Sequence, residues 1–182
     1  MSDLLSIENA VLPTHYDIRL EIDPTKTNYK GSVQLLLKPN GLNGDSFREF
    51  KLHSKDLVIL SASIGDVGSS DELKTVLEVT QDNAGELIVF SSPNSISFST
   101  EKGLELKIAY IGRIKTIKTY NDDTEGIFKT NFMDPKTGKA NGYVIATHGQ
   151  PYFARTIFPC IDEPFWKTTF QLSIKTLSRF TV

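Results

Sequence analysis

The sequence predicts an all-β protein, an antiparallel β-sandwich, on three observations. Apolar residues alternate with polar residues at a period of two along most of the chain, which is typical of strands with one buried face. Turn residues recur every ~8–12 positions, as in sandwiches and open barrels. No apolar stripe with helical spacing is longer than about two turns, so no long helix is expected.

The first half of the chain contains the clearest strand. Apolar side chains at even positions from Tyr16 to Ile22 alternate with charged side chains at odd positions, which predicts a strand with one solvated face. Further strands in this half are expected at residues 33–37, 50–52, 57–64, 77–79 and 87–89. Turn signals separate them at Asp23-Pro24, Pro39-Asn40-Gly41, Asn43-Gly44 and Asp82-Asn83-Ala84-Gly85. Residues 65–71 are interpreted as a hairpin loop within the domain.

The second half continues the pattern, with strands expected at residues 104–110, 126–132, 143–147 and 169–175. Residues 151–155 are the best candidate for a short helix, because Pro151 suits a first helical position. The last expected strand begins shortly before the sequence stops at Val182. We therefore expect one β-rich domain over residues 1–182 that is truncated at its C-terminus.

Composition narrows the class of protein. The 182 residues carry 20 Lys and Arg against 22 Asp and Glu, a formal net charge of -2, and 39% of them are apolar. This apolar content disfavours disorder, and the near-neutral charge disfavours the basic surface of a nucleic-acid-binding protein. No run approaches the ~20 apolar residues of a membrane span. A single cysteine and the absence of a signal-peptide pattern favour a cytoplasmic location, without direct nucleic-acid or membrane partners.

Few side chains suited to metal binding or nucleophilic catalysis are present. The candidates are His15, His53, His148 and Cys160, and no His-Glu-x-x-His motif occurs, so no metal site is expected. A nucleophilic pair of Cys160 with His148 is conceivable, but Cys160 follows an apolar stretch, where a buried structural thiol is commoner. His15 and His53 adjoin expected strands and are interpreted as hydrogen-bonded surface side chains.

One segment is different in kind. Residues 147–170 read Thr-His-Gly-Gln-Pro-Tyr-Phe-Ala-Arg-Thr-Ile-Phe-Pro-Cys-Ile-Asp-Glu-Pro-Phe-Trp-Lys-Thr-Thr-Phe. This resembles the block Thr-Gln-x-Glu/Gln-Pro-x-x-Ala-Arg-x-x-Phe-Pro-Cys-x-Asp-Glu-Pro-x-x-Lys-x-x-Phe of the zinc aminopeptidases of the aminopeptidase N type, peptidase family M1. Further similarity lies at residues 12–17, 29–31, 52–57, 110–112 and 126–128. Residues 4–9, 50–61, 126–132 and 146–151 resemble most a ribosome-associated branch of the family found in fungi.

The resemblance implies a saddle-like β-sandwich, the N-terminal domain of an aminopeptidase N-like protein. In the family this domain packs on a thermolysin-like catalytic domain that holds the zinc and a Gly-Ala-Met-Glu-Asn-type motif. Neither motif occurs in these residues. The resemblance therefore implies zinc in the parent's catalytic domain, no cofactor or metal in this chain, and no catalysis by this chain alone.

The resemblance also implies one substrate-binding residue, Gln150. A peptide's α-ammonium needs hydrogen-bond acceptors, and the side-chain carbonyl of Gln150 would supply one, although more weakly than a carboxylate. The alternative for Gln150 is an ordinary polar turn residue. Two neighbours depart from the family's pattern: His148 stands where Gln is frequent, and Phe153 where Asp is frequent.

The remaining residues of the block are interpreted as architecture. Arg155 beside the acidic pair Asp162 and Glu163 is expected to form a bidentate ion pair that holds the loop from Pro159 to Pro164. This structural motif comprises Arg155, Pro159, Cys160, Asp162, Glu163 and Pro164. Phe165 and Trp166 are expected to pack within the domain or against the catalytic domain.

Two functional classes remain open. In the first, the chain is the substrate-amine-binding N-terminal domain of a zinc aminopeptidase that removes N-terminal residues from peptides. In the second, the parent is a peptidase-like factor that binds N-termini of nascent chains at the ribosome, with hydrolysis secondary or lost. Residues beyond Val182 would distinguish them. An isolated interaction module is a third and less specific interpretation.

Overall fold

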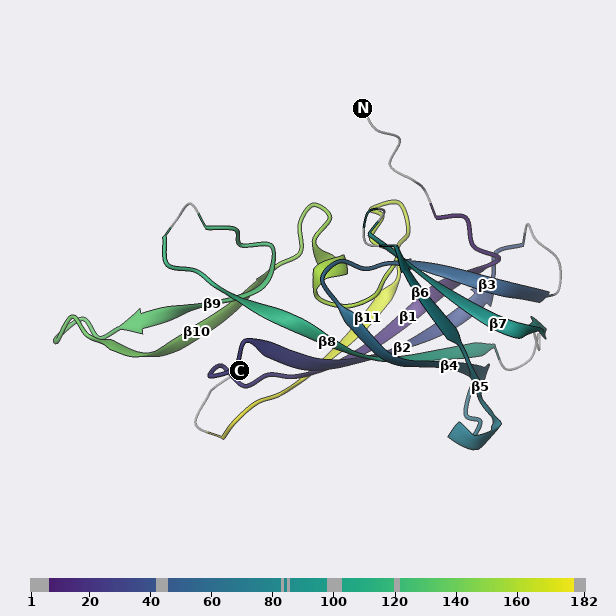
Figure 1. Cartoon of the computed structure of the whole chain (residues 1–182), viewed down its shortest axis with the longest axis horizontal. Coiled ribbons are helices and arrows are strands. Elements are labelled where there is room, and N and C mark those ends of the chain that lie inside the picture. Colours follow the sequence, from purple (N-terminus) through teal and green to yellow (C-terminus); the bar gives the residue numbers. More distant parts are fainter. Residues whose placement is uncertain are drawn as a thin grey trace, which may run out of the picture.

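The computed structural model describes residues 7–41, 46–82, 84, 86–97, 103–119 and 122–178. Figure 1 shows strands arranged as two packed sheets, with one hairpin extending away from them. The strands are β1 (Val11–Glu21), β2 (Asn28–Pro39), β3 (Ser46–His53), β4 (Val58–Asp66), β5 (Thr75–Val76), β6 (Glu78–Asp82), β7 (Leu87–Ser97), β8 (Leu104–Thr116), β9 (Gly126–Met133), β10 (Ala140–His148) and β11 (Thr169–Lys175). The turn signal Asn43-Gly44 and residues 4–6 lie outside the described residues. The all-β prediction is confirmed.

The larger sheet has the strand order β10-β9-β8-β2-β1-β11, and β4 also pairs with β8 and carries the short β5. The smaller sheet has the order β3-β7-β6. β8 joins the parts of the large sheet, because it pairs with β2 along one edge and with β4 and then β9 along the other. The β9–β10 hairpin extends from this junction (Figure 1).

Two strand pairs differ from the expected antiparallel arrangement. β1 and β11 are parallel, with His15 opposite Thr169, and β8 and β9 are parallel from Ile114 opposite Ile127. Parallel pairing requires a crossover connection, in contrast to the tight turn of a hairpin. Hydrophobic alternation reports which face of a strand is buried but not the direction of its neighbour, so the pattern could not reveal these pairs.

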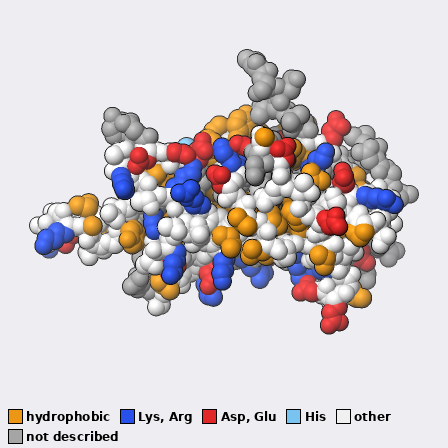
Figure 2. Space-filling view, viewed as in Figure 1, with side chains coloured by type: hydrophobic (Ala, Val, Ile, Leu, Met, Phe, Trp, Pro, Cys, Tyr) orange, Lys and Arg blue, Asp and Glu red, His pale blue; other side chains and the backbone are white. Residues whose placement is uncertain are grey.

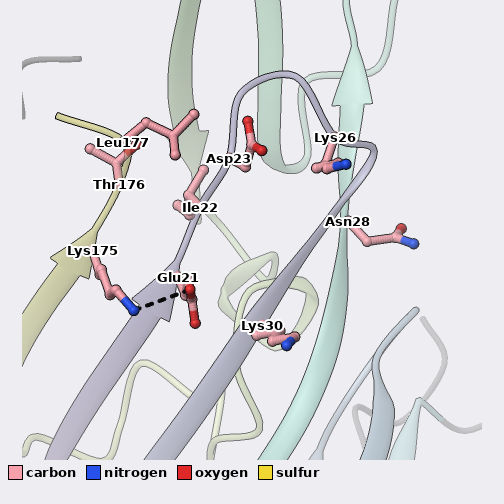
Figure 3. A pocket seen from close by; sticks show the side chains of 9 residues that line it. All are labelled: Glu21, Ile22, Asp23, Lys26, Asn28, Lys30, Lys175, Thr176 and Leu177. Atoms are coloured by element: carbon pink, nitrogen blue, oxygen red, sulfur yellow. Dashed lines mark hydrogen bonds and ion pairs between the residues drawn. The ribbon is translucent and has the colours of Figure 1, made fainter. Parts of the chain in front are cut away.

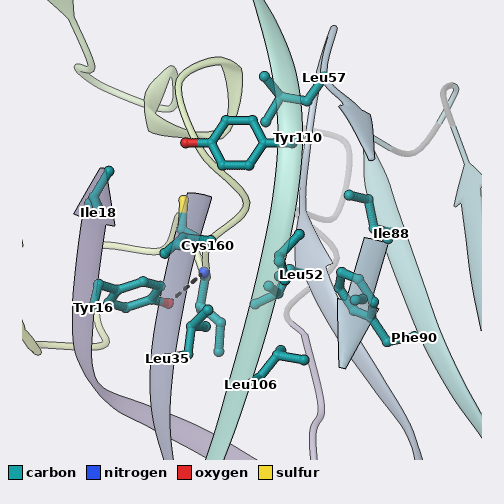
Figure 4. Close-up of a cluster of buried hydrophobic side chains, with 14 of the residues drawn as sticks. Tyr16, Ile18, Leu35, Leu52, Leu57, Ile88, Phe90, Leu106, Tyr110 and Cys160 are labelled. Carbon is teal, nitrogen blue, oxygen red and sulfur yellow. Dashed lines mark hydrogen bonds between the residues drawn. The ribbon is translucent and has the colours of Figure 1, made fainter. Parts of the chain in front are cut away.

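The core lies between the two sheets. The alternation predicted for 16–22 places Tyr16, Ile18 and Leu20 on its buried face, and β2 contributes Leu35 from the adjacent strand. From the small sheet, Phe50 and Phe90 stack with ring centroids 6.3 Å apart. Figure 4 shows side chains from both sheets meeting in this cluster. Full burial of one such aliphatic side chain contributes about 1.5–3 kcal/mol.

Two glycines on neighbouring strands make room for two tyrosines. Tyr110 lies opposite Gly31, and Tyr29 lies opposite Gly112, in the β2–β8 register. A Cβ atom at either glycine would overlap the facing tyrosine ring, and the two rings meet edge to face at 6.3 Å. These glycines therefore serve close packing, one of the reasons for glycine in a strand interior.

β11 extends the apolar face of β1 into solvent. Phe170, Leu172 and Ile174 lie on the same face as the buried residues of β1, and Phe170 stacks on Tyr16 with ring centroids 5.1 Å apart. All three side chains are nonetheless exposed. This stripe is the exposed margin of the core in the described chain.

Two predictions about connections need adjustment. The short helix expected at 151–155 is the 3-10 turn η2 (Ala154–Thr156), with turn residues before it. The segment 65–71 continues β4 as far as Asp66, and η1 (Asp71–Leu73) then leads into β5, which pairs with β4. No helix among the described residues is long and apolar enough to span a membrane.

Candidate functional site

Gln150 is exposed and lies between β10 and η2. We call residues 147–156, which comprise the end of β10, the connection and η2, the Gln150 loop. The loop is closed by its own backbone, because the amide of Phe153 donates to the carbonyl of Gly149 at 3.0 Å. The peptide bond between Gln150 and Pro151 is cis. The hydroxyl of Thr156 donates to the carbonyl of Phe153 at 2.7 Å. The exposed carboxamide therefore stands on a hydrogen-bonded turn.

Both departures from the family's pattern lie together at the base of this loop. The rings of His148 and Phe153 contact edge to face, with centroids 5.9 Å apart. The Nδ1 atom of His148 lies 3.4 Å from the hydroxyl of Thr124, which belongs to the connection between β8 and β9. The sequence-predicted residue Gln150 thus has an imidazole and a phenyl ring as near neighbours on its own loop.

Arg155 anchors the end of the loop. Its Nε donates to Asp162 Oδ2 at 3.0 Å, and its backbone amide donates to the same oxygen at 3.2 Å. The second carboxylate on the guanidinium belongs to Glu86, which accepts from Nη1 at 3.1 Å. Glu163, which the sequence paired with Arg155, instead accepts from the backbone amide of Ile7 at 2.8 Å. Sequence reasoning missed Glu86 because it lies on a different turn, between β6 and β7.

A chain of ion pairs continues from Arg155 across three connecting segments. Lys55 Nζ lies 3.0 Å from Glu86 and 3.8 Å from Glu125. Lys115 Nζ lies 3.8 Å from Glu125 and also pairs with Asp123. Each of these carboxylates therefore faces at least one lysine or arginine.

The loop from Pro159 to Pro164 is bound to the end of β3. Cys160 and His53 exchange backbone hydrogen bonds of 2.8 and 3.2 Å, and the amide of Asp162 donates to His53 Nδ1 at 3.1 Å. Pro159 is buried, whereas Pro164 is exposed. The loop is thus held by backbone pairing as well as by the Arg155 ion pair.

His53 is buried, with 5% of its surface exposed, so its interpretation as a surface histidine was wrong. Burial lowers the pKa of its imidazole, and the positive charge of Arg155 lowers it further. An isolated β-bridge pairs His53 with Cys160, and the amide of Asp162 reaches its ring, contacts between residues too distant in sequence to be expected. His15 accords with its prediction, since Nδ1 lies 2.8 Å from the Thr169 hydroxyl at an exposed position.

Cys160 lies in the hydrophobic core, where Figure 4 shows its sulfur among buried side chains. Burial raises the pKa of this thiol well above its usual range, which opposes formation of a nucleophilic thiolate. The His148 side chain contacts Phe153 and Thr124, whereas the backbone of Cys160 is hydrogen-bonded to the backbone of His53. The conceivable Cys160–His148 pair is therefore not assembled.

The two aromatic residues after Pro164 differ. Trp166 is partly buried against the core, while Phe165 is 81% exposed and meets the Trp166 ring edge to face at 5.3 Å. Phe165 is thus available for contact outside the described chain.

The described residues contain no group of three or more His, Cys, Asp or Glu side chains that could hold a metal ion. One surface pocket lies where β1 and β11 end and β2 begins. Lys175 Nζ lies 3.3 Å from Glu21 there, and Figure 3 shows the two side chains directed toward each other. That pocket is lined by residues of the β1–β2 turn and the end of β11, and Gln150 is not among them. Figure 2 shows acidic and basic side chains interspersed over the face in view.

Comparison with known proteins identifies the domain. Residues 12–182 match the family described as the peptidase M1 N-terminal domain. The chain is 51% identical to Protein TMA108 of Saccharomyces cerevisiae over 99% of its length, covering 20% of that protein. It is 30% identical to mitochondrial aminopeptidase 2 of the same yeast, over 90% of the chain and 15% of the relative. It is 29% identical to endoplasmic reticulum aminopeptidase 2 of Bos taurus, over 96% and 17%.

The chain therefore spans about a fifth or less of the length of these relatives. The family match covers nearly all of the described fold, including the Gln150 loop and the segment that carries Arg155. From this match we conclude that the chain belongs to the peptidase M1 family, as an N-terminal domain of that family.

Proposed function

We propose that this chain is the part of an aminopeptidase N-like metallopeptidase that helps to bind the N-terminal residues of peptides. Membership of the peptidase M1 family supports this proposal. Gln150 is the residue that meets the substrate, and its carbonyl oxygen accepts a hydrogen bond from the α-amine. The rest of the site, including the side-chain pocket, belongs to the parent's catalytic domain, which is this domain's partner.

The observation that carries the proposal is that Gln150 is held on a turn fixed by hydrogen bonds and an ion pair. The carboxamide is exposed, while the turn below it is fixed by the Phe153–Gly149 hydrogen bond and by the buried ion pair of Arg155 with Asp162. A binding group held on a rigid turn loses little conformational entropy when it meets a ligand. This domain would therefore act as a preformed wall of the substrate site.

Zinc does not fit the side chains in the described part of this chain. A catalytic zinc needs three protein ligands and an open position. Cys160 is buried and His53 accepts a backbone hydrogen bond, so these donors already belong to the core. We assign the zinc of the proposed metallopeptidase to the parent's catalytic domain, and no chemical step to this chain alone.

A second candidate is a cytoplasmic, ribosome-associated factor that binds N-termini of nascent chains with little or no hydrolysis. Gln150 favours this candidate in one respect, since a neutral acceptor holds an ammonium group less firmly than a carboxylate would. Both candidates use the same face of the domain. Neither requires direct contact of this domain with nucleic acid or a membrane.

The test uses the intact parent protein and the variant Gln150→Ala. Loss of one hydrogen bond to the charged α-amine should weaken binding of a linear peptide about 10–100-fold. Binding of a head-to-tail cyclic peptide of the same composition, which has no terminus, should not change. Equal effects on both peptides, or none, would remove Gln150 from the site. Co-sedimentation with ribosomes together with a defective zinc motif beyond Val182 would favour the second candidate.

A further inference from the structure

The charge of the Gln150 loop suggests which peptide ends it accepts. Residues 147–153 contain no Asp or Glu, and an imidazole such as that of His148 is neutral or cationic but never anionic. We propose that this loop binds peptide N-termini irrespective of their charge, so that the ligand class includes Nα-acetylated ends as well as free amines. This inference rests on the proposed function, because it concerns the same residue.

Three carboxylates near the loop in the described part of the chain, those of Asp162, Glu86 and Glu125, are already paired with cations. Asp162 and Glu86 face Arg155 at 3.0 and 3.1 Å, and Glu86 also faces Lys55 at 3.0 Å. In the connection that contacts His148 through Thr124, Glu125 lies 3.8 Å from Lys55. Turning one of these carboxylates toward a ligand would break a partly buried ion pair, which is unfavourable. The loop therefore presents no uncommitted negative charge to an ammonium group.

The carboxamide of Gln150 suits both kinds of peptide end. Its Oε1 accepts from a free ammonium group, and its Nε2 donates to the carbonyl of an acetyl group. A carboxylate would favour the ammonium further, because both partners of the hydrogen bond would then carry opposite charges. The ring of Phe153, three positions further along the same loop, would add a surface that packs against an acetyl methyl or lies beside a cation. Gln150 is thus a specificity-determining residue because of its neutrality.

The experiment compares two fluorescein-labelled peptides that differ only in acetylation of the N-terminus. Dissociation constants are measured by fluorescence anisotropy with the intact parent protein, in the presence of a chelator that prevents hydrolysis. The wild-type protein should bind both peptides, with affinities that differ by less than about tenfold. Gln150→Glu should shift their ratio by about tenfold in favour of the free amine. The matched control Asn94→Asp, an exposed amide-to-carboxylate change on β7 of the small sheet, should leave the ratio unchanged.

Gln150→Ala separates this inference from the proposed function. If the alanine variant weakens binding of both peptides, the proposed function and the inference stand together. If it weakens only the free peptide, and the wild type already prefers that peptide by about tenfold or more, the inference is overturned while the proposed function stands. If it changes neither affinity, the proposed function itself fails. A shift in the Asn94→Asp control as large as that of Gln150→Glu would also overturn the inference.

Discussion

Replacing Arg155 with lysine measures how firmly the Gln150 loop is held. The guanidinium donates from Nε to Asp162 and from Nη1 to Glu86, and Nη2 lies 3.4 Å from the Asp162 carbonyl. Lysine keeps the charge but replaces a planar fork by a single ammonium group. We therefore expect Arg155→Lys to retain one of the two carboxylate contacts and to lose the other.

The expected cost follows from burial. The side chains of Arg155 and Asp162 are only 9% and 11% exposed, so solvent screens this pair weakly. A hydrogen bond to a charged group contributes about 1.5–3 kcal/mol, and a carboxylate left without its partner adds to the loss. The free energy of unfolding should fall by about 2–4 kcal/mol, which lowers Tm by about 4–16 °C in a domain of this size.

Urea denaturation followed by Trp166 fluorescence is the assay, because this tryptophan is the only one in the chain and lies just beyond the loop. Arg19→Lys is the matched control: Arg19 is 66% exposed and bonds Asp17 at 2.8 Å. Water screens an exposed pair of this kind, so Arg19→Lys should change the stability little. Equal loss of stability in the two variants would refute the argument that burial makes the Arg155 contacts strong.

Three further predictions concern the core. Gly31→Ala should destabilise the domain by at least about 1–3 kcal/mol in urea denaturation, because the new methyl group would overlap the Tyr110 ring. In the control Gly149→Ala the new methyl group makes only ordinary van der Waals contacts, so stability should change by less than about 0.5 kcal/mol. Burial lowers the pKa of His53 in the folded state, so below the ordinary histidine pKa of about 6.5 the unfolded state binds more protons. The free energy of unfolding should therefore be highest above that pH and should fall on acidification below it. His53→Asn should flatten this pH dependence. Cys160 should react with a thiol reagent only after denaturation, and rapid labelling of the native domain would contradict its burial.

Strands could be predicted from the sequence where the alternation of buried and exposed residues lies within one short stretch of the chain. The segment around Tyr16 has a buried residue at every second position, and the same holds for the strand containing Leu35, so alternation found both. Alternation also found β9 and β11, but not that β9 pairs parallel with β8 and β11 with β1, because the direction of a neighbouring strand depends on long connections. The same limit explains the error for His53, which is covered by a segment more than a hundred residues later.

The candidate site shows a similar division. The motif containing Arg155 and Asp162 lies within one short stretch, and the structure places these two side chains together. The contribution of Glu86 comes from another hairpin and carries no signal in the sequence near Arg155. The role of Gln150 stays a prediction, since contacts with a ligand depend on surfaces outside the described residues.

The side-by-side placement of β1 and β11 has a consequence for the time course of biosynthesis. His15 and Thr169 are partners across this parallel pair but are separated by 154 positions. At a translation rate of about 5–20 residues per second, the outer neighbour of β1 is made roughly 8–30 s after β1 itself. Of the two neighbours of β1 in the described sheet, β2 alone has been made during that interval, so the other edge of β1 stays unpaired until β11 emerges.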